Sequence, residues 1–219
     1  MSGLPIARTA LQYTNLYVRF GLGRDFAPDD PGWQRYVAGL RGGRDVRAWT
    51  YDFYRHESRG DGDPPVTARF GCFAYARSGE DRIRLHFRNA ERDGASPLSH
   101  ARKAERIAEL SALFAHVRRT EPGPLRVAGA SWLYNIEAYR RLFPPPYLAT
   151  ARVVGDRFQR MPLWGQFLDH RGDVKPSLVR EFRERLARLQ TIDGLGRCFP
   201  LQVRALEAPV RAFYDFHGV

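Results

Sequence analysis

Lysine and cysteine are scarce in this chain of 219 residues. Only Lys103 and Lys175 among its 35 basic residues are lysine, so arginine carries almost all of the positive charge. The two cysteines, Cys72 and Cys198, lie in apolar surroundings typical of buried thiols, which argues against a disulfide framework or a metal site. Because no run of about 18 apolar residues occurs, we expect no membrane-spanning helix.

The amino terminus also lacks the basic, apolar and small-residue order of a secretory signal, so we expect a cytoplasmic protein. Hydrophobic residues make up 43% of the chain, which is enough for a packed core and argues against disorder. The net charge of +11 attracts phosphate groups. The basic residues are nevertheless spread along the chain, and an acidic small molecule explains the charge as well as a nucleic acid, which we do not favour.

Apolar spacing and turn residues predict an α/β fold, namely a mixed, largely antiparallel twisted sheet flanked by helices. We expect strands over residues 11–20, 67–77, 81–89, 125–133, 147–154 and 198–206, and helices over 33–40, 45–54, 97–121, 136–143 and 176–190. Residues 1–155 are expected to form the core domain. Residues 156–219 are expected to form a helical carboxyl-terminal extension that packs on the same domain.

The clearest pattern is a β-hairpin that leads through a short polar loop into a long helix. Strand side chains alternate, so the second strand of the hairpin has two faces. Its apolar face holds Ile83, Leu85 and Phe87, and its polar face holds Arg82, Arg84, His86 and Arg88. The polar face is either a solvated surface or the wall of a site for an anionic ligand.

Ser96 followed by Pro97 predicts the start of the long helix, because a capping hydroxyl then precedes a residue that needs no amide donor. The unpaired amides and the dipole of such a helix start favour an anion. Gly94 would let the backbone approach a phosphate closely, and arginines would add charged contacts. The anion-binding candidates are Arg88, Arg92, Gly94, Ala95 and Ser96. A capped helix without a ligand is the alternative.

The order of these elements resembles that of the GNAT acyltransferases (Gcn5-related N-acetyltransferases). In that family the loop before the long helix carries a [Q/R]-x-x-G-x-[G/A] pattern that holds the pyrophosphate of coenzyme A. Glu91, Gly94 and Ser96 occupy the three defined positions here, and Gly94 is the one that matches. The resemblance implies acyl-CoA as the co-substrate, bound beside splayed central strands.

Many members of the family also carry N-x-x-A-x-x-x-Y in the next helix, and the tyrosine protonates the departing thiolate. Asn135 and Ala138 match this motif, which makes Asn135 a further cofactor-binding candidate, but Leu142 stands at the tyrosine position. Tyr134 precedes the predicted helix and is a catalytic candidate, although the role of the family's acid does not transfer to it by position. His86 is the candidate general base, with a hydrogen-bonded surface histidine as the alternative.

The acceptor is expected to be an amine or a hydroxyl. Ser131 and Trp132 follow an apolar strand, where ligands of open α/β sheets bind, and are substrate-binding candidates. Trp164 and Gln166 lie in a mixed aromatic and polar segment and are candidates too. Structural roles are the alternative for all four, and no spacing of ligands indicates a metal.

Two other functions stay open. One is a basic nucleic-acid-binding or regulatory module, and the other is an enzyme that acts on an anionic small molecule without coenzyme A. Aromatic residues near the carboxyl terminus are compatible with a homodimer as well as with the edge of a core.

Overall fold

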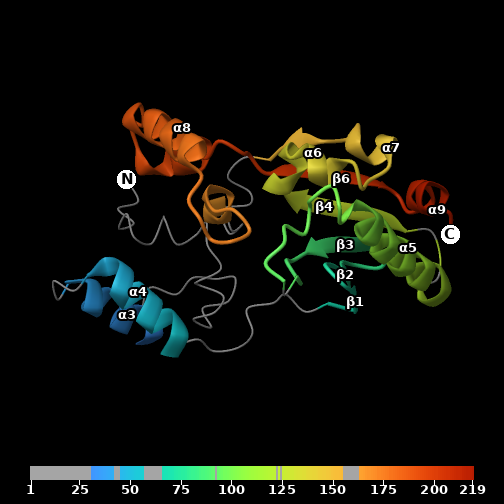
Figure 1. Ribbon diagram of the computed structural model, residues 1–219, viewed down its shortest axis with the longest axis horizontal. Coiled ribbons are helices and arrows are strands. Elements are labelled where there is room, and N and C mark those ends of the chain that lie inside the picture. The colour runs from blue at the N-terminus through green and yellow to red at the C-terminus, as the bar shows by residue number, and fades with distance from the viewer. Residues whose placement is uncertain are drawn as a thin grey trace. The chain divides into compact units, whose positions relative to one another are not determined.

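The computed structural model describes residues 31–41, 45–56, 66–91, 93–121, 123, 125–154 and 163–219. The chain divides into two compact units, one made of residues 1–64 with 159–162 and the other of residues 65–158 with 163–219 (Figure 1). The predicted strand over residues 11–20 lies outside the described residues.

The described part of the first unit is a pair of helices, α3 (Pro31–Arg41) and α4 (Val46–His56), and both were predicted. Aromatic residues hold the pair together. The rings of Tyr36 and Phe53 lie 5.3 Å apart between centroids. The indole N–H of Trp49 donates to the carbonyl oxygen of Tyr36 at 3.0 Å. Such paired amphipathic helices gain their stability mainly from burial of their facing sides.

The described part of the second unit contains a six-stranded sheet with the order β1-β2-β3-β4-β6-β5. The strands are β1 (Ala68–Phe70), β2 (Phe73–Arg77), β3 (Arg82–Phe87), β4 (Arg126–Ser131), β5 (Arg152–Val153) and β6 (Arg204–Pro209). Strands β3 and β4 are parallel, and every other neighbouring pair is antiparallel. The predicted mixed, largely antiparallel sheet is confirmed.

Helices cover the apolar face of this sheet. They are α5 (Lys103–Thr120), α6 (Glu137–Arg140), α7 (Pro145–Leu148) and α9 (Arg211–His217). Ile83 and Leu85 of β3 are buried and alternate with half-buried polar residues, as predicted. From α5, Leu110 and Phe114 pack into the same core. Each such side chain contributes about 1.5–3 kcal/mol when it leaves water, so α5 is fixed against the sheet (Figure 1).

The predicted start of the long helix at Pro97 is wrong, since α5 begins at Lys103. Residues 97–102 form turns instead, in which the N–H of Ser99 donates to the carbonyl of Ser96 at 3.1 Å. The side chain of Arg102, at the N-cap, makes no capping hydrogen bond. Arg102, the last residue of this segment, pairs with Glu91 at 3.4 Å and with Asp93 in the preceding loop.

Two predictions around β4 also need correction. The strand predicted over residues 125–133 ends earlier, since β4 ends at Ser131. The hydroxyl of Ser131 accepts from the N–H of Leu133 at 3.1 Å and caps a 3-10 helix, η1 (Trp132–Asn135). The strand predicted over residues 147–154 is reduced to β5, because the preceding prolines start the short helix α7. Proline fits the first turn of a helix, where its missing N–H costs nothing.

The segment after residue 163 forms a second aromatic cluster and then returns to the sheet. Its elements are η3 (Leu163–Phe167), α8 (Pro176–Ala187) and η4 (Ile192–Cys198). The predicted strand over residues 198–206 begins later, since β6 starts at Arg204 and lies between β4 and β5. The segment expected to be an extension therefore supplies an internal strand. In the described parts of the chain, no helix has the length and apolar character needed to cross a membrane.

Candidate functional site between strands β3 and β4

The parallel strands β3 and β4 pair over only part of their length. Their register consists of Arg82 with Arg126, Ile83 with Val127 and Arg84 with Ala128. Both strands are described to their ends, yet residues 85–87 and 129–131 form no register pairs with each other. On their outer sides these residues pair with β2 and β6. The two strands therefore stop pairing after Arg84 and Ala128, and the unpaired stretch between their inner edges is called the β3–β4 opening below.

Two tyrosine hydroxyls lie against β4 where this opening starts. The hydroxyls of Tyr134 and Tyr147 are 2.7 Å apart. A Cβ at position 129 would overlap both hydroxyl oxygens, so Gly129 is needed for their approach to the strand. Burial raises the pKa of Tyr134 well above its usual value, which keeps the hydroxyl protonated.

Arg141 connects the segments that follow the two strands. Its guanidinium donates to the carbonyl oxygens of Leu98 at 3.1 Å and Ser99 at 2.8 Å. Leu98 and Ser99 lie in the turns before α5, whereas Arg141 follows α6. Its Nε is buried and has no hydrogen-bond partner among the described residues. Arg141 therefore joins the β3 side and the β4 side of the opening.

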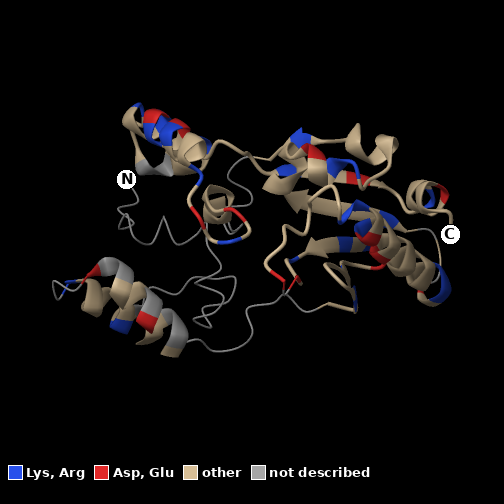
Figure 2. Ribbon diagram, in the orientation of Figure 1, with Lys and Arg blue, Asp and Glu red and all other residues tan. Residues whose placement is uncertain are grey.

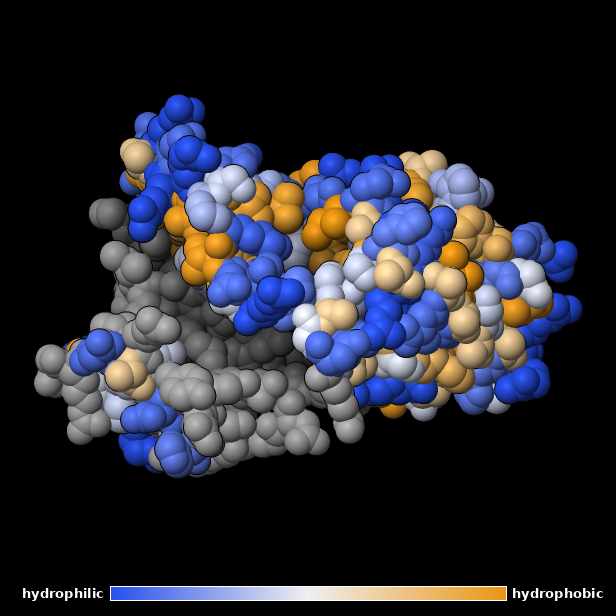
Figure 3. Space-filling model, in the orientation of Figure 1, coloured by the Kyte–Doolittle hydropathy of each residue, from blue (hydrophilic) through white to orange (hydrophobic). Residues whose placement is uncertain are grey.

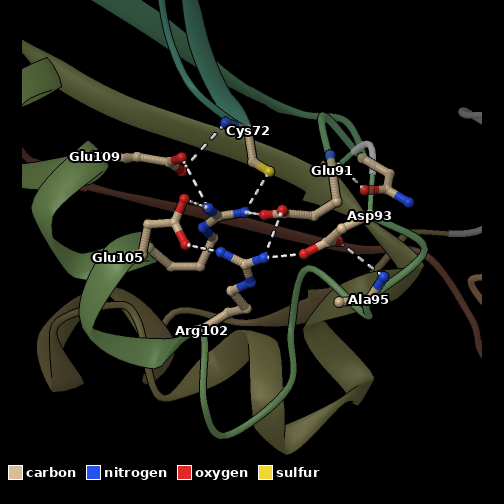
Figure 4. A network of polar contacts seen from close by, with 9 residues as sticks. Cys72, Glu91, Asp93, Ala95, Arg102, Glu105 and Glu109 are labelled. Atoms are coloured by element: carbon tan, nitrogen blue, oxygen red, sulfur yellow. Dashed lines mark hydrogen bonds and ion pairs between the residues drawn. The ribbon is translucent and has the colours of Figure 1, made fainter.

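The loop between β3 and α5 is organised by a buried arginine, Arg106, which is only 2% exposed (Figure 4). Its guanidinium donates to Glu91 at 2.7 Å and to the sulfur of Cys72. It also pairs with Glu105 at 2.7 Å and Glu109 at 3.0 Å. Arg106 thereby attaches the loop and the turn between β1 and β2 to the first turns of α5.

Arg102 adds a second guanidinium to the same network. It pairs with Asp93, with Glu105 at 2.7 Å and with Glu91 at 3.4 Å. The two arginines are thus surrounded by four carboxylates, those of Glu91, Asp93, Glu105 and Glu109. This excess of negative charge disfavours a phosphate in the loop.

The protonation behaviour of these carboxyls follows their surroundings. Burial raises the pKa of Glu109, although the N–H of Cys72 and the charge of Arg106 act in the opposite direction. The hydrogen bond from Arg102 lowers the pKa of Glu105. For Asp93 the largest cause of a lowered pKa is the backbone N–H of Ala95. Glu105 and Asp93 are consequently held as anions at neutral pH.

The loop residues predicted to bind the cofactor do not form an open cradle. The N–H of Ala95 donates to the side chain of Asp93 at 3.0 Å and so is already used. Gly94 has a positive φ of 71° and is exposed. Ser96 is half-buried and its carbonyl closes a turn. Arg88 is exposed after β3, and Arg92 lies outside the described residues.

The polar face of β3 is half-buried and basic at the positions of Arg82, Arg84 and His86. Glu207 of β6 partly balances this charge, since it pairs with Arg82 at 3.5 Å and with Arg126. Figure 2 shows that acidic residues lie among the basic ones on α5 and α8. The described surface of the second unit therefore has mixed charge.

Three candidates lie at or just after the end of β4 and have structural contacts, namely the substrate-binding candidates Ser131 and Trp132 and the cofactor-binding candidate Asn135. Ser131 caps η1, and the side-chain amide of Asn135 donates to the carbonyls of Trp132 at 2.8 Å and Gln202 at 2.7 Å. These bonds connect η1 to the residues before β6. The side chain of Trp132 is half-buried beside them.

Trp164 and Gln166 have structural contacts around η3. The Trp164 ring packs on Phe182 and Phe199, with centroids 5.4 Å and 4.9 Å away. Gln166 is fully buried, accepts from the N–H of Leu201 at 2.8 Å and donates to the carbonyl of Leu163 at 3.0 Å. Both side chains fix η3 against the neighbouring segments.

Arg106 and Tyr147 contribute to the site and were not predicted from the sequence. Arg106 lies four residues before Leu110, on the same face of the helix as the buried stripe, and a charged residue there must find a partner when buried. The position of Arg106 on the buried face of the helix therefore indicated, in the sequence, a charged residue with a buried partner. Tyr147 follows three prolines and was assigned to a strand, so nothing in the local sequence connected it with Tyr134.

Comparison with protein-family models, curated proteins and solved structures gives no match for this chain. Within the described residues, no group of three or more His, Cys, Asp or Glu side chains is placed to hold a metal ion.

Proposed function

We propose that the protein is an acyltransferase that takes an acyl group from acyl-CoA at the opening between β3 and β4. The proposal rests on the way the strands pair in the sheet. One parallel pair lies within an otherwise antiparallel sheet, and it separates after three register pairs. Splayed parallel strands are what the GNAT resemblance implies for the acyl-CoA site, and this is the support that the proposal has.

The opening suits an extended ligand that contains amide groups. Residues 85–87 and 129–131 form no pairs across it, so their inner backbone groups need other partners. An amide-bearing chain can bind there as an added strand would. The pantetheine arm of coenzyme A is such a chain, and it would carry the thioester toward Gly129 and the Tyr134 hydroxyl.

The transfer would proceed by direct attack of an acceptor amine or hydroxyl on the thioester carbonyl. A new bond forms to the carbonyl carbon, the carbon–sulfur bond breaks and the thiolate leaves. His86 would take the proton of the acceptor, and Tyr134 would donate a proton to the thiolate. His86 belongs to the polar face of β3 and Tyr134 to the buried side of the sheet, so they would flank the opening.

The proposal does not rely on a pyrophosphate cradle at Gly94. Asp93 already uses the N–H of Ala95, and four carboxylates surround Arg102 and Arg106. We therefore expect the chain to bind acyl-CoA mainly through its pantetheine arm and thioester, with little of the affinity that the family gains from the phosphates.

Thermal unfolding with acetyl-CoA, a long-chain acyl-CoA and an oligonucleotide tests this function, because a ligand of the native state raises the melting temperature. We expect stabilisation by an acyl-CoA, worth about 2.7 kcal/mol when the ligand is at 100 times its Kd. An oligonucleotide that stabilises the protein in its place, with steep salt dependence, would instead favour the nucleic-acid function.

A matched pair of variants locates the ligand. Ala130→Val adds two methyl groups beside the opening on β4, whereas Ala76→Val makes the same change on β2, on the same sheet face. Both alanines are half-buried. We expect Ala130→Val to weaken acyl-CoA binding at least tenfold and Ala76→Val to leave it unchanged. Equal effects of the two substitutions, or no stabilisation of the unaltered protein at millimolar acyl-CoA, would refute the proposed site.

A further inference from the structure

A pocket of about 280 Å³ lies between the end of α8 and η4, and it shares no residue with the β3–β4 opening. Among the described residues that line it, three are arginines, Arg185, Arg188 and Arg197, and none is acidic. Gln190 and Thr191 add side-chain hydrogen-bond donors. The volume is near the lower end of the range for small-molecule sites, roughly 300–1,000 Å³.

Arg185 is fixed in place and its charge is balanced. Its guanidinium pairs with Glu181, one helical turn earlier on α8, and donates to the carbonyl oxygen of Phe199 at 3.1 Å. A guanidinium held in this way keeps its remaining donors in one geometry. Arg185 therefore gives the pocket a preorganised wall without adding net charge.

Arg188 and Arg197 differ from Arg185 because neither forms an ion pair with any side chain that the structure describes. Both are exposed. Glu184 lies one turn before Arg188 on α8 and does not pair with it. The pocket thus presents two positive charges that the described side chains leave uncompensated. Figure 2 shows basic and acidic residues along α8, and Figure 3 shows the hydrophilic surface of that helix next to hydrophobic residues.

The backbone of η4 brings Arg197 into the pocket. A Cβ at Gly194 would lie 2.6 Å from the Cδ1 of Leu189 and 3.1 Å from the Nη2 of Arg197, so both side chains pack closely on this glycine. Cys198 also lines the pocket and is 2% exposed. Burial raises the pKa of the Cys198 thiol, and Arg185 and Arg197 oppose this rise, which agrees with two guanidiniums near its sulfur. The basic groups therefore converge on one concave surface.

We propose that this pocket binds the phosphate group of a small phosphorylated molecule. A phosphate monoester carries a charge of about −1.5 to −2 at pH 7, which matches the two uncompensated guanidiniums. Arginine forks bind phosphate oxygens through paired N–H donors. Thr191 and Gln190 supply neutral donors, and Leu189 with Cys198 supplies an apolar surface for the rest of the ligand. The site is independent of the proposed acyl transfer.

Calorimetric titration with glycerol 3-phosphate tests the site, with glycerol and acetate as reference ligands. The variant Arg188→Gln/Arg197→Gln removes both free charges of the pocket. The control Arg180→Gln/Arg183→Gln removes the same charge from two exposed arginines of α8 outside the lining. We expect saturable binding of glycerol 3-phosphate, weakened at least tenfold in the first variant and unchanged in the control. Equal weakening in both, or no saturable binding to the unaltered protein, would overturn the proposal.

A second measurement needs no substitution. Cys72 and Cys198 are both buried free thiols, so each reacts with iodoacetamide only slowly. We expect glycerol 3-phosphate to slow the alkylation of Cys198 severalfold and to leave that of Cys72 unchanged, as measured by mass spectrometry. Equal rates for Cys198 with and without the ligand would contradict binding in this pocket.

Discussion

The stability of the second unit should fall in mild acid because of one buried histidine, His217. It lies in α9, is 9% exposed and stacks on Phe114 with ring centroids 5.4 Å apart. Both ring nitrogens are buried without a hydrogen-bond partner among the described residues. Burial lowers the pKa of His217 to about 4 from a usual value of 6.5, so the folded protein holds the neutral ring.

The direction of the effect follows from proton linkage. The unfolded chain binds a proton at His217 near pH 6.5, and the folded chain does so only near pH 4. Stability from this group is therefore fully present above about pH 6.5 and is lost as the pH falls toward about 4. With about 1.4 kcal/mol for each pKa unit, the unfolding free energy drops by about 3 kcal/mol over that window.

Urea unfolding of the unaltered protein and of His217→Phe, at several values between about pH 7.5 and pH 4, measures this contribution. Phenylalanine keeps the ring stack, cannot be protonated and removes two unsatisfied nitrogens. The variant should therefore be as stable as the unaltered protein at neutral pH, or more stable. The difference in unfolding free energy between the two proteins should change by about 3 kcal/mol across the window. His100→Gln, which removes a histidine from an exposed position, is the control. Parallel profiles for the unaltered protein and His217→Phe would show that the buried His217 ring does not destabilise the fold in acid.

Three further substitutions test the packing around the site. Arg106→Met leaves Glu91 and Glu109 without their buried partner and should lower the free energy of unfolding in urea by about 3–5 kcal/mol. Adding Glu91→Gln and Glu109→Gln should restore part of this free energy. Gly129→Ala places a methyl group onto the hydroxyls of Tyr134 and Tyr147 and should cost about 1–3 kcal/mol; if it melts like the unaltered protein, the hydroxyls do not lie against β4. Gln166→Leu removes the buried side chain that accepts from the N–H of the half-buried Leu201, and it should lower the unfolding free energy by about 1–3 kcal/mol, as read from thermal melts.

Much of the fold was accessible from local patterns. The paired helices α3 and α4, the hairpin of β2 and β3, the stripe of α5 and the strand β4 follow from apolar spacing and turn residues. Local patterns mispredicted element boundaries where a proline or a capping residue is compatible with more than one local structure. Pro97 lies in a turn before α5, while the prolines after Phe143 begin α7, and the previous helix, α6, has already ended at Arg140.

The candidate site could be predicted only in part. A basic, arginine-rich α/β chain with a hairpin, a polar loop and a long helix was predictable, because these features depend on neighbours a few residues apart. The separation of β3 and β4 after Arg84 and Ala128, and the position of β6 beside β4, became visible only in the folded chain. The fold also placed four carboxylates around Arg102 and Arg106, where the loop had suggested a phosphate. Such contacts join residues far apart in the chain, and their energies depend on which charges are buried together, which no local pattern encodes.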